Sequence, residues 1–361
     1  MQALQILAGP TARQRLRDHG LRATDVRVVP GAAGGPKGLI LSALDAHLFG
    51  EFLPSGGHEV HLLGASIGAW RMATACLTRD AAQADAEFQR LAHDYAWQDY
   101  ESEQPGKRPS AAVVSRAFAG KLGEIFGGRE AEVLSHPQFR LHVFTSRGRH
   151  VLGREGRLRT PLGYLGAFAA NAMSRRAMGG WLERVVFSDQ RSPLPMPLGD
   201  YRSRQVSLDA GNLKPSILAS CSIPFWLQAV HDIEGAPAGA YWDGGITDYH
   251  LHLNYAAMVG DGIALYPHFQ ASVVPGWLDK AFKRRHRASA FLDNVVLLTP
   301  NPEWVKTLPN GKLPDRNDFQ RYVDDVPGRA RDWLRAVKEG ERLRDEFREA
   351  CARPSLDVQA L

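Results

Sequence analysis

A serine between two glycines stands where a strand is expected to give way to a helix. Residues 64–68 read Gly-Ala-Ser-Ile-Gly, a G-x-S-x-G pattern with Ser66 at its centre and Gly64 and Gly68 on either side. This pattern is typical of a sharp strand-to-helix turn that exposes a serine hydroxyl, because the glycines allow close backbone approach. An ordinary glycine-rich turn without chemical function is the alternative, since the pattern is short.

A second glycine-rich turn precedes the first one along the chain. Residues 33–38 read Ala-Gly-Gly-Pro-Lys-Gly and again join an expected strand to an expected helix. The amides of Gly34 and Gly35 can point at one position, where the helix N-terminus adds positive potential, as a developing oxyanion requires. A phosphate is the alternative ligand. The spacing matches neither the P-loop nor the dinucleotide-binding pattern, so a nucleotide site is disfavoured.

A serine hydroxyl becomes a good nucleophile only when a neighbouring base accepts its proton. The best candidate for that base is Asp243, in the run Trp-Asp-Gly-Gly at 242–245. It ends an expected strand, so its carboxylate is expected at the same carboxyl edge of the sheet as Ser66. The alternative is an aspartate that only forms an Asp-Gly turn.

Two histidines, His250 and His252, follow this aspartate closely. They would complete a Ser-Asp-His order like that of α/β-hydrolases, or ligate a metal, but no third ligand is evident. We favour a packing or pocket-lining role for both. A serine acyltransferase with a distant histidine is a related alternative, which the Asp-Gly-Gly and Gly-Gly turns oppose.

The elements around these motifs predict an α/β fold. Strand, glycine-rich turn and helix follow one another twice, which indicates a mostly parallel sheet with helices on both faces. Strands are expected at 25–30, 59–64, 140–145, 185–188, 205–208, 240–243, 262–266 and 294–299, and helices at 39–52, 67–77, 82–97, 111–126 and 162–181. A charged, proline-containing loop at 98–109 is a candidate flank of the active site.

Length and composition fit a folded α/β protein. The 361 residues are 44% hydrophobic and 23% charged, and the three cysteines lie far apart in no CxxC pair. Neither a disulfide framework nor a thiolate zinc site is therefore expected. The chain start shows no secretory signal, and the weakly polar stretch 161–173 is shorter than the roughly 20 residues that span a bilayer. A cytoplasmic location is expected.

The last part of the chain is predicted to be helical. We expect a main domain at 1–312 and a C-terminal helical extension at 313–361, because 326–351 places apolar residues at helical spacing. This extension is expected to pack on the main domain, with membrane-surface binding as the alternative.

The distribution of basic and apolar residues along the sequence does not identify a binding partner. The net charge is +5, and the run 280–287 holds the densest group of basic residues. It is expected to be a solvated helix face, with docking to an anionic membrane as the alternative. Nucleic acid is disfavoured because the run lacks a series of stacking aromatic residues that alternates with the basic ones. The apolar helix at 162–173 is expected to pack in the core, or to line an acyl pocket or act as a lid.

In this order, the Gly-Gly-Pro-Lys-Gly run at 34–38, the G-x-S-x-G at 64–68 and the Asp-Gly-Gly run at 243–245 resemble the patatin-like phospholipase family. Residues 219–224, Ala-Ser-Cys-Ser-Ile-Pro, are similar to the small-residue segment that precedes the Asp-Gly-Gly turn in that family. The resemblance covers about residues 25–300. It implies a three-layer α/β/α fold and a Ser-Asp dyad that hydrolyses acyl esters, commonly of phospholipids or lysophospholipids.

On this resemblance, Ser66 is the expected nucleophile, Asp243 the expected base, and the amides of Gly34 and Gly35 the expected oxyanion hole. Lys37 matches the family's basic residue after the glycines and is expected to bind substrate or another anion. The other motif glycines are expected to support these turns: Gly38, Gly64, Gly68, Gly244 and Gly245. No metal or cofactor is expected.

Two departures from the family pattern matter. Ala33 replaces the first glycine of the usual run and Pro36 has no N–H, so the oxyanion hole depends on Gly34 and Gly35. After 243–245 the family often has Asn-Pro, where this chain has Ile-Thr-Asp-Tyr-His, a difference that bears on the substrate. A lipid or acyl ester is the expected partner, and peripheral membrane contact stays open as an alternative. A lipid-binding protein without turnover is the non-enzyme alternative, and the oligomeric state is not predicted.

Overall fold

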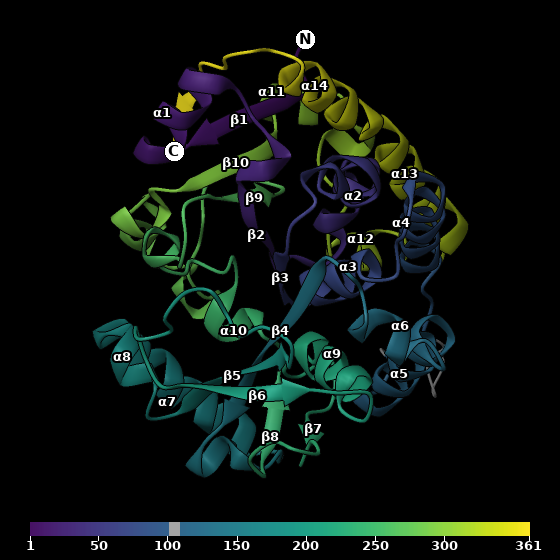
Figure 1. Cartoon of the computed structure of the whole chain (residues 1–361). Helices are drawn as coiled ribbons and strands as arrows, with labels where there is room; N and C mark the ends of the chain where they lie inside the picture. Colours follow the sequence, from purple (N-terminus) through teal and green to yellow (C-terminus); the bar gives the residue numbers. More distant parts are fainter. Residues whose placement is uncertain (101–108) are drawn as a thin grey trace.

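A long central sheet organises the molecule (Figure 1). The computed structural model describes residues 1–100 and 109–361, so most of the loop expected at 98–109 lies outside the described residues. The strand order is β11-β1-β10-β9-β2-β3-β4-β5-β6, and β8 pairs with both β4 and β7. The strands are β1 Leu4–Ala8, β2 Val26–Gly31, β3 Val60–Ala65, β4 Phe139–Gly148, β5 Leu182–Asp189, β6 Ser203–Leu208, β7 Val230–His231, β8 Ala240–Trp242, β9 Ile263–Pro267, β10 Val295–Pro300 and β11 Gln359–Ala360.

Most neighbouring strands of the sheet are parallel. The exceptions among the described residues are the antiparallel pairs β1 with β10, β4 with β5, β4 with β8, and β7 with β8. The parallel run β10-β9-β2-β3-β4 forms the middle of the sheet. Its strands are buried along nearly their whole length, as parallel strands covered by helices on both faces must be.

Helices cover both faces of the sheet, which confirms the expected three-layer α/β/α fold. Figure 1 shows α2, α4, α13 and α14 on one side and α7, α8 and α10 on the other. The helices are α1 Pro10–His19, α2 Ser42–His47, α3 Ile67–Ala75, α4 Ala81–Ala96, α5 Ala111–Phe126, α6 Glu130–Leu134, α7 Arg159–Met173, α8 Arg175–Met178, α9 Leu213–Cys221, α10 Gly245–Asp248, α11 Pro302–Val305, α12 Asp318–Arg321, α13 Val326–Glu339 and α14 Glu341–Cys351.

Several elements differ from the sequence expectation. The first strand and helix, β1 and α1, were not predicted, nor was α9, whose Pro215 is tolerated because it stands in the first helical turn. The helix expected at 162–181 is interrupted at Ser174, which is extended and caps α8 by accepting a hydrogen bond from the Ala177 N–H. Residues 283–286 form a short 3₁₀ turn rather than the expected helix face.

The expected packing of 162–173 in the core is wrong for its large apolar side chains. Leu162, Leu165 and Met173 of α7 are exposed to solvent. The buried side of the helix carries smaller and more polar residues, among them Thr160 and Asn171.

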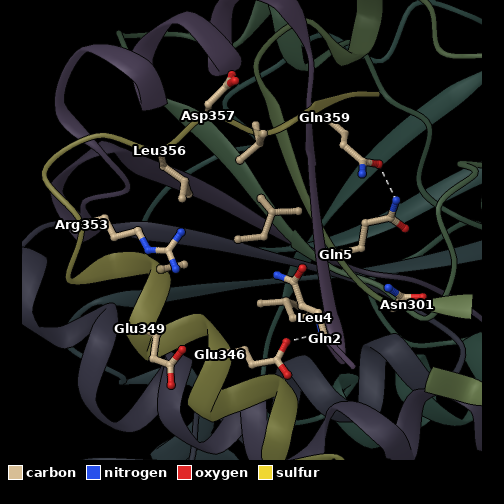
Figure 2. Close-up of a pocket in the computed structure, with 13 residues that line it drawn as sticks. Gln2, Leu4, Gln5, Asn301, Glu346, Glu349, Arg353, Leu356, Asp357 and Gln359 are labelled. Atoms are coloured by element: carbon tan, nitrogen blue, oxygen red, sulfur yellow. Dashed lines mark hydrogen bonds between the residues drawn. The ribbon is translucent and has the colours of Figure 1, made fainter. Parts of the chain in front are cut away.

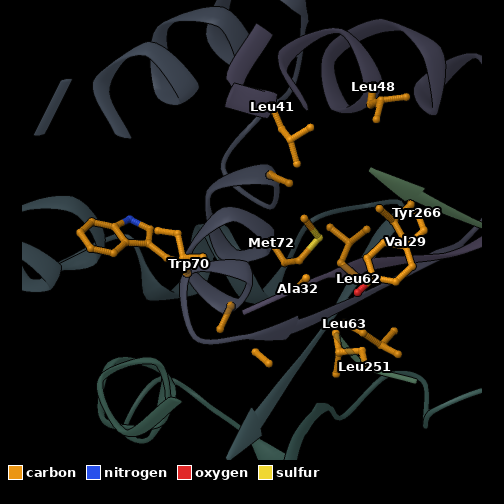
Figure 3. Close-up of a cluster of buried hydrophobic side chains, with 14 of the residues drawn as sticks. Val29, Ala32, Leu41, Leu48, Leu62, Leu63, Trp70, Met72, Leu251 and Tyr266 are labelled. Carbon is orange, nitrogen blue, oxygen red and sulfur yellow. The ribbon is translucent and has the colours of Figure 1, made fainter. Parts of the chain in front are cut away.

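The main core lies between the sheet and the helices on its two faces. Figure 3 shows part of it, where Val29 of β2, Leu62 of β3 and Met72 of α3 pack with Leu41 and Tyr266. Side chains of the C-terminal helices belong to the same core, because Trp333 of α13 and Phe347 of α14 are both buried. The division of the chain at residue 312 stays a prediction.

Candidate active site

Ser66 lies on the sharp turn between β3 and α3. Its φ of 55° is rare for a residue with a side chain and marks a strained turn. A Cβ on Gly64 would come within 2.3 Å of the Ala69 Cα, and one on Gly68 within 1.8 Å of the Gly31 carbonyl oxygen. Both glycines are therefore required by close backbone approach, as the G-x-S-x-G pattern predicts.

The pairing of β3, β4 and β8 brings Asp243 to this turn. β3 runs parallel to β4 as far as the pair Ala65–Phe144, and β8 pairs antiparallel with β4 at Ser146–Trp242. Because β5 occupies the other side of β4, β3 and β8 lie on the same side of β4 and point toward each other. Their carboxyl ends meet, so Asp243 arrives opposite Ser66. We predicted this meeting from the rule that parallel strands end at a common carboxyl edge of the sheet. In the structure, β8, the strand that carries Asp243, is antiparallel to β4.

The two side chains form a direct hydrogen bond. The Ser66 hydroxyl donates to Asp243 Oδ2 at 2.7 Å, and the Gly245 N–H donates to Oδ1 at 2.7 Å. The exposed fractions of Ser66 and Asp243 are only 4% and 5%. Burial raises the pKa of Asp243 above its ordinary value, while the Ser66 hydrogen bond and the charge of Arg316 act against this shift. The carboxylate is thus a stronger proton acceptor than an exposed aspartate.

Ser220 of α9 connects both sides of this pair, a role that sequence reasoning missed. The Ser66 N–H donates to the Ser220 hydroxyl at 2.9 Å, and that hydroxyl donates to the Phe144 carbonyl at 2.6 Å. The Ser220 carbonyl accepts the Gly244 N–H at 3.0 Å. The only sequence signal for this role was the resemblance of residues 219–224 to a family segment.

The glycine-rich turn between β2 and the residues after it, at 31–38, packs against both parts of the pair. A Cβ on Gly68, after Ser66, would strike Gly31, and a Cβ on Gly245 would lie 2.6 Å from the Ala33 Cβ. The Ala33 N–H donates to the Tyr249 carbonyl at 2.9 Å and is thus occupied. Gly35 has a φ of 58°, a left-handed conformation that favours glycine. The turn at 31–35 therefore packs against the turns that carry Ser66 and Asp243, and the role of the Gly34 and Gly35 amides as an oxyanion hole stays a prediction.

The other motif residues line this junction. A Cβ on Gly244 would lie 2.1 Å from the Phe144 carbonyl oxygen, and one on Gly34 2.4 Å from the Phe269 ring. A Cβ on Gly38 would find only ordinary contacts, the nearest at 3.5 Å. The Lys37 ammonium is 5.6 Å from the centre of the Phe269 ring and is half-buried.

Two further cations lie beside Lys37 and were not predicted as site residues. The Arg316 Nε would be 3.2 Å from a Cβ on Gly35, and the Lys280 Nζ is 4.0 Å from the centre of the Tyr249 ring. Burial lowers the pKa of Lys280 to about 8, helped by the charges of Arg316 and Lys37. Lys280 was visible in sequence only as part of a basic run, and Arg316 gave no signal.

The histidines occupy other positions. His250 is buried, its Nδ1 is 2.9 Å from the Val274 nitrogen and 3.1 Å from the Ser272 carbonyl oxygen, and burial lowers its pKa well below the ordinary value. His252 Nε2 is 3.3 Å from the Ser289 hydroxyl. Within the described part of the chain, neither histidine hydrogen-bonds to Ser66 or Asp243, and no group of three or more His, Cys, Asp or Glu is arranged to hold a metal ion.

A cavity of about 610 Å³ lies elsewhere, at the β11–β1 edge of the sheet (Figure 2). Its lining includes Gln5 and Gln359, whose side chains hydrogen-bond at 2.6 Å, together with Glu346 and Arg353. None of the predicted site residues lines it.

Comparison with protein-family models gives no match, and comparison with curated protein sequences gives none either. Among solved structures, VipD from Legionella pneumophila is similar to this chain, with 12% sequence identity and a TM-score of 0.35. The likeness covers 96% of this chain and 70% of VipD, and at this score it carries no argument. In the described residues, no helix is both long and apolar enough to cross a bilayer.

Proposed function

We propose that this protein is a serine acyl hydrolase that cleaves lipid acyl esters through a dyad of Ser66 and Asp243. The observation that carries the proposal is the 2.7 Å hydrogen bond from the Ser66 hydroxyl to the Asp243 carboxylate. The strained turn, the buried base and the glycine-rich turn are what nucleophilic acyl transfer needs. The sequence resemblance to patatin-like phospholipases supports the same reaction.

In the first half of the reaction, the Ser66 oxygen attacks the ester carbonyl carbon while Asp243 accepts the hydroxyl proton. The carbonyl oxygen gains negative charge, which the amides of Gly34 and Gly35 receive. The C–O bond to the alcohol then breaks and Asp243 returns the proton to the leaving oxygen. An acyl-Ser66 ester remains.

In the second half, water attacks the acyl carbon and gives its proton to Asp243. The bond to Ser66 breaks, the fatty acid leaves, and the proton returns to the serine oxygen. Every step uses side chains and amides of this chain, so the proposed reaction requires no metal or cofactor.

A lipid substrate is supported by the surroundings of the dyad as well as by the resemblance. Arg316 lies against Gly35, and Lys37 and Lys280 are close enough to Arg316 for their charges to interact. This group of positive charges beside the glycine-rich turn suits the phosphate or carboxylate of an anionic lipid. We propose that these three cations orient the substrate head group.

Intact-mass analysis after treatment with a fluorophosphonate tests the proposal. We expect a single adduct on the parent protein, none on Ser66→Ala, and an unchanged adduct on Ser55→Ala, a variant at an exposed serine. Hydrolysis of a soluble p-nitrophenyl ester should follow the same order. Labelling of Ser66→Ala at the parental rate would refute the assignment, and lipid binding without any ester hydrolysis by the parent would favour the non-catalytic alternative.

A further inference from the structure

The polarity of α7 is reversed with respect to that of an ordinary surface helix. Its solvent side and the N-cap residue before it carry large apolar side chains with exposed fractions from 39% to 84%. They are Leu158 at the N-cap and Leu162, Leu165, Phe168 and Met173 in the helix, which we call the α7 outer face. Its buried side carries Thr160, Tyr164 and Asn171. A helix that covers a core in water normally places these two kinds of residue the other way round.

Specific contacts fix this orientation of the helix. The Thr160 hydroxyl accepts the Gly156 N–H at 3.1 Å, and the Asn171 side-chain amide donates to Asp279 Oδ1 at 2.8 Å. Tyr164 packs edge-on against the Trp242 ring, with centroids 5.9 Å apart. Rotation of α7 to bury its leucines would break these contacts and leave polar atoms without partners.

Asp279 connects α7 to a cluster of basic residues at 283–287 through hydrogen bonds to both. This buried carboxylate contacts Asn171 and Arg175 and accepts a hydrogen bond from Arg285 at 2.7 Å. Phe282 stacks on Phe168 of the outer face, with centroids 5.7 Å apart. The residues that follow Phe282, Lys-Arg-Arg-His-Arg at 283–287, form the basic segment, in which Lys283, Arg284 and Arg287 are exposed.

The inner side of α7 packs beside the strand that carries Asp243. Tyr164, on the inner side of the same helix, packs on Trp242, the residue before Asp243. Phe225 adds a further exposed apolar side chain beside Tyr164, with ring centroids 6.1 Å apart. The helix that carries the outer face is therefore a near neighbour of Asp243, with an exposed aromatic side chain, Phe225, beside its inner side.

We propose that the α7 outer face and the basic segment dock this protein onto an anionic lipid surface. An apolar stripe flanked by Lys and Arg is the arrangement by which interfacial helices bind membranes, the apolar side chains entering the acyl region and the cations meeting the head groups. A second copy of this chain is a poorer partner, because docking two such faces would bring their basic segments together. The link to turnover rests on the proposed function, whereas lipid binding itself does not.

Vesicle co-sedimentation tests this proposal. The full chain, as parent and as Ser66→Ala, is mixed with vesicles of phosphatidylcholine alone or of phosphatidylcholine with phosphatidylglycerol. We expect both proteins to bind the mixed vesicles more strongly, and binding to weaken as salt is added, because salt screens the basic segment. Leu162→Gln with Leu165→Gln should lower the partition coefficient at least roughly tenfold, since each leucine loses its transfer into the acyl region.

Matched variants separate docking from folding and from catalysis. Val323→Gln removes an apolar side chain that is 70% exposed elsewhere on the molecule and should bind like the parent. Lys283→Glu with Arg284→Glu should abolish the preference for phosphatidylglycerol. The docking variants should keep the parental melting temperature and soluble-ester hydrolysis.

Two outcomes would overturn the inference. One is parental vesicle binding by the double leucine variant. The other is a parent protein that elutes as a dimer in size-exclusion chromatography and becomes monomeric in that variant without any change in vesicle binding. A parent that binds vesicles but hydrolyses no ester would leave the docking surface standing and remove the proposed hydrolase.

Discussion

The backbone N–H of Ser66 donates a hydrogen bond to the side-chain hydroxyl of Ser220, 2.9 Å away. Through its own carbonyl, which accepts the Gly244 N–H, Ser220 also holds the turn that carries Asp243. One buried serine on α9 therefore fixes the distance between the proposed nucleophile and the proposed base, although it touches neither reacting atom. Such a residue is a positioning residue, and the consequences of its removal can be measured.

Ser220→Ala is expected to lower kcat by roughly 10- to 100-fold with little change in KM, because the dyad loses its alignment rather than its chemistry. It should also cost about 1–3 kcal/mol of stability, since the Phe144 carbonyl loses its buried partner. Steady-state kinetics on a soluble ester and thermal unfolding give both values. Ser222→Ala is the control, because the Ser222 hydroxyl, one residue past the end of α9, donates to the Leu218 carbonyl of that helix. Equal kcat losses in both variants would contradict the positioning role.

Asp243→Asn is expected to lower kcat by roughly 10³- to 10⁴-fold, about as much as Ser66→Ala, because the two side chains act as one unit.

The same change should raise the melting temperature at pH 7. Burial raises the pKa of Asp243 in the folded state above that in the unfolded chain, so the ionised carboxylate costs stability at pH values above both. As the pH falls through the folded-state pKa toward the unfolded one, the parent regains that stability and the difference should disappear. A melting temperature that falls at pH 7 would contradict this account.

The pH dependence of kcat/KM should show an acid limb that reports Asp243. Because burial raises its pKa, the limb is expected above the ordinary carboxyl value of 3.8. Arg316→Gln removes a charge that lowers this pKa, and should therefore move the limb to higher pH without abolishing turnover. Rates over a pH series for both proteins measure the displacement. An acid limb that disappears in His250→Gln would instead favour the His-assisted alternative.

Gly68→Ala is expected to disrupt the site, because the new Cβ would lie 1.8 Å from the Gly31 carbonyl oxygen with only backbone around it. The glycine-rich turn would have to move away from Ser66, so we expect loss of fluorophosphonate labelling and a lower melting temperature. Gly120→Ala is the matched control within α5, where a Cβ meets nothing within 4 Å. It should leave labelling unchanged and stabilise the protein by about 0.5–1 kcal/mol through helix propensity. Equal labelling of the two variants would contradict the proposed role of the turn.

Much of the fold was readable from local patterns. The predicted strands that correspond to β2, β3, β9 and β10 are short apolar runs bounded by turns. Such a run is the sequence pattern of a buried parallel strand. The helices α4 and α5 were predicted to within a residue or two. The strand β1 was not predicted because a five-residue run interrupted by Gln5 is a weak signal and has no partner strand nearby in the sequence. It pairs with β10, almost 300 residues away.

The direction of β8 and the polarity of α7 could not be derived in this way. A three-residue strand carries no signal for parallel or antiparallel pairing, which depends on the strand that receives it. Apolar residues at 162–173 predict burial by the hydrophobic effect, yet the helix turns its leucines outward because Asp279 and Trp242 hold its inner side.

The sequence alone determined which residues could do chemistry: a serine on a glycine-flanked turn, an aspartate before two glycines, and a pair of glycine amides. These features are local, since each depends on a few neighbouring residues and on the backbone freedom of glycine. Only the tertiary structure decided that the serine and the aspartate meet, that Ser220 holds them, and that Lys280 and Arg316 stand beside them. Contacts between residues so far apart in the chain depend on how the strands pair and the helices pack, and no short stretch of sequence encodes that arrangement.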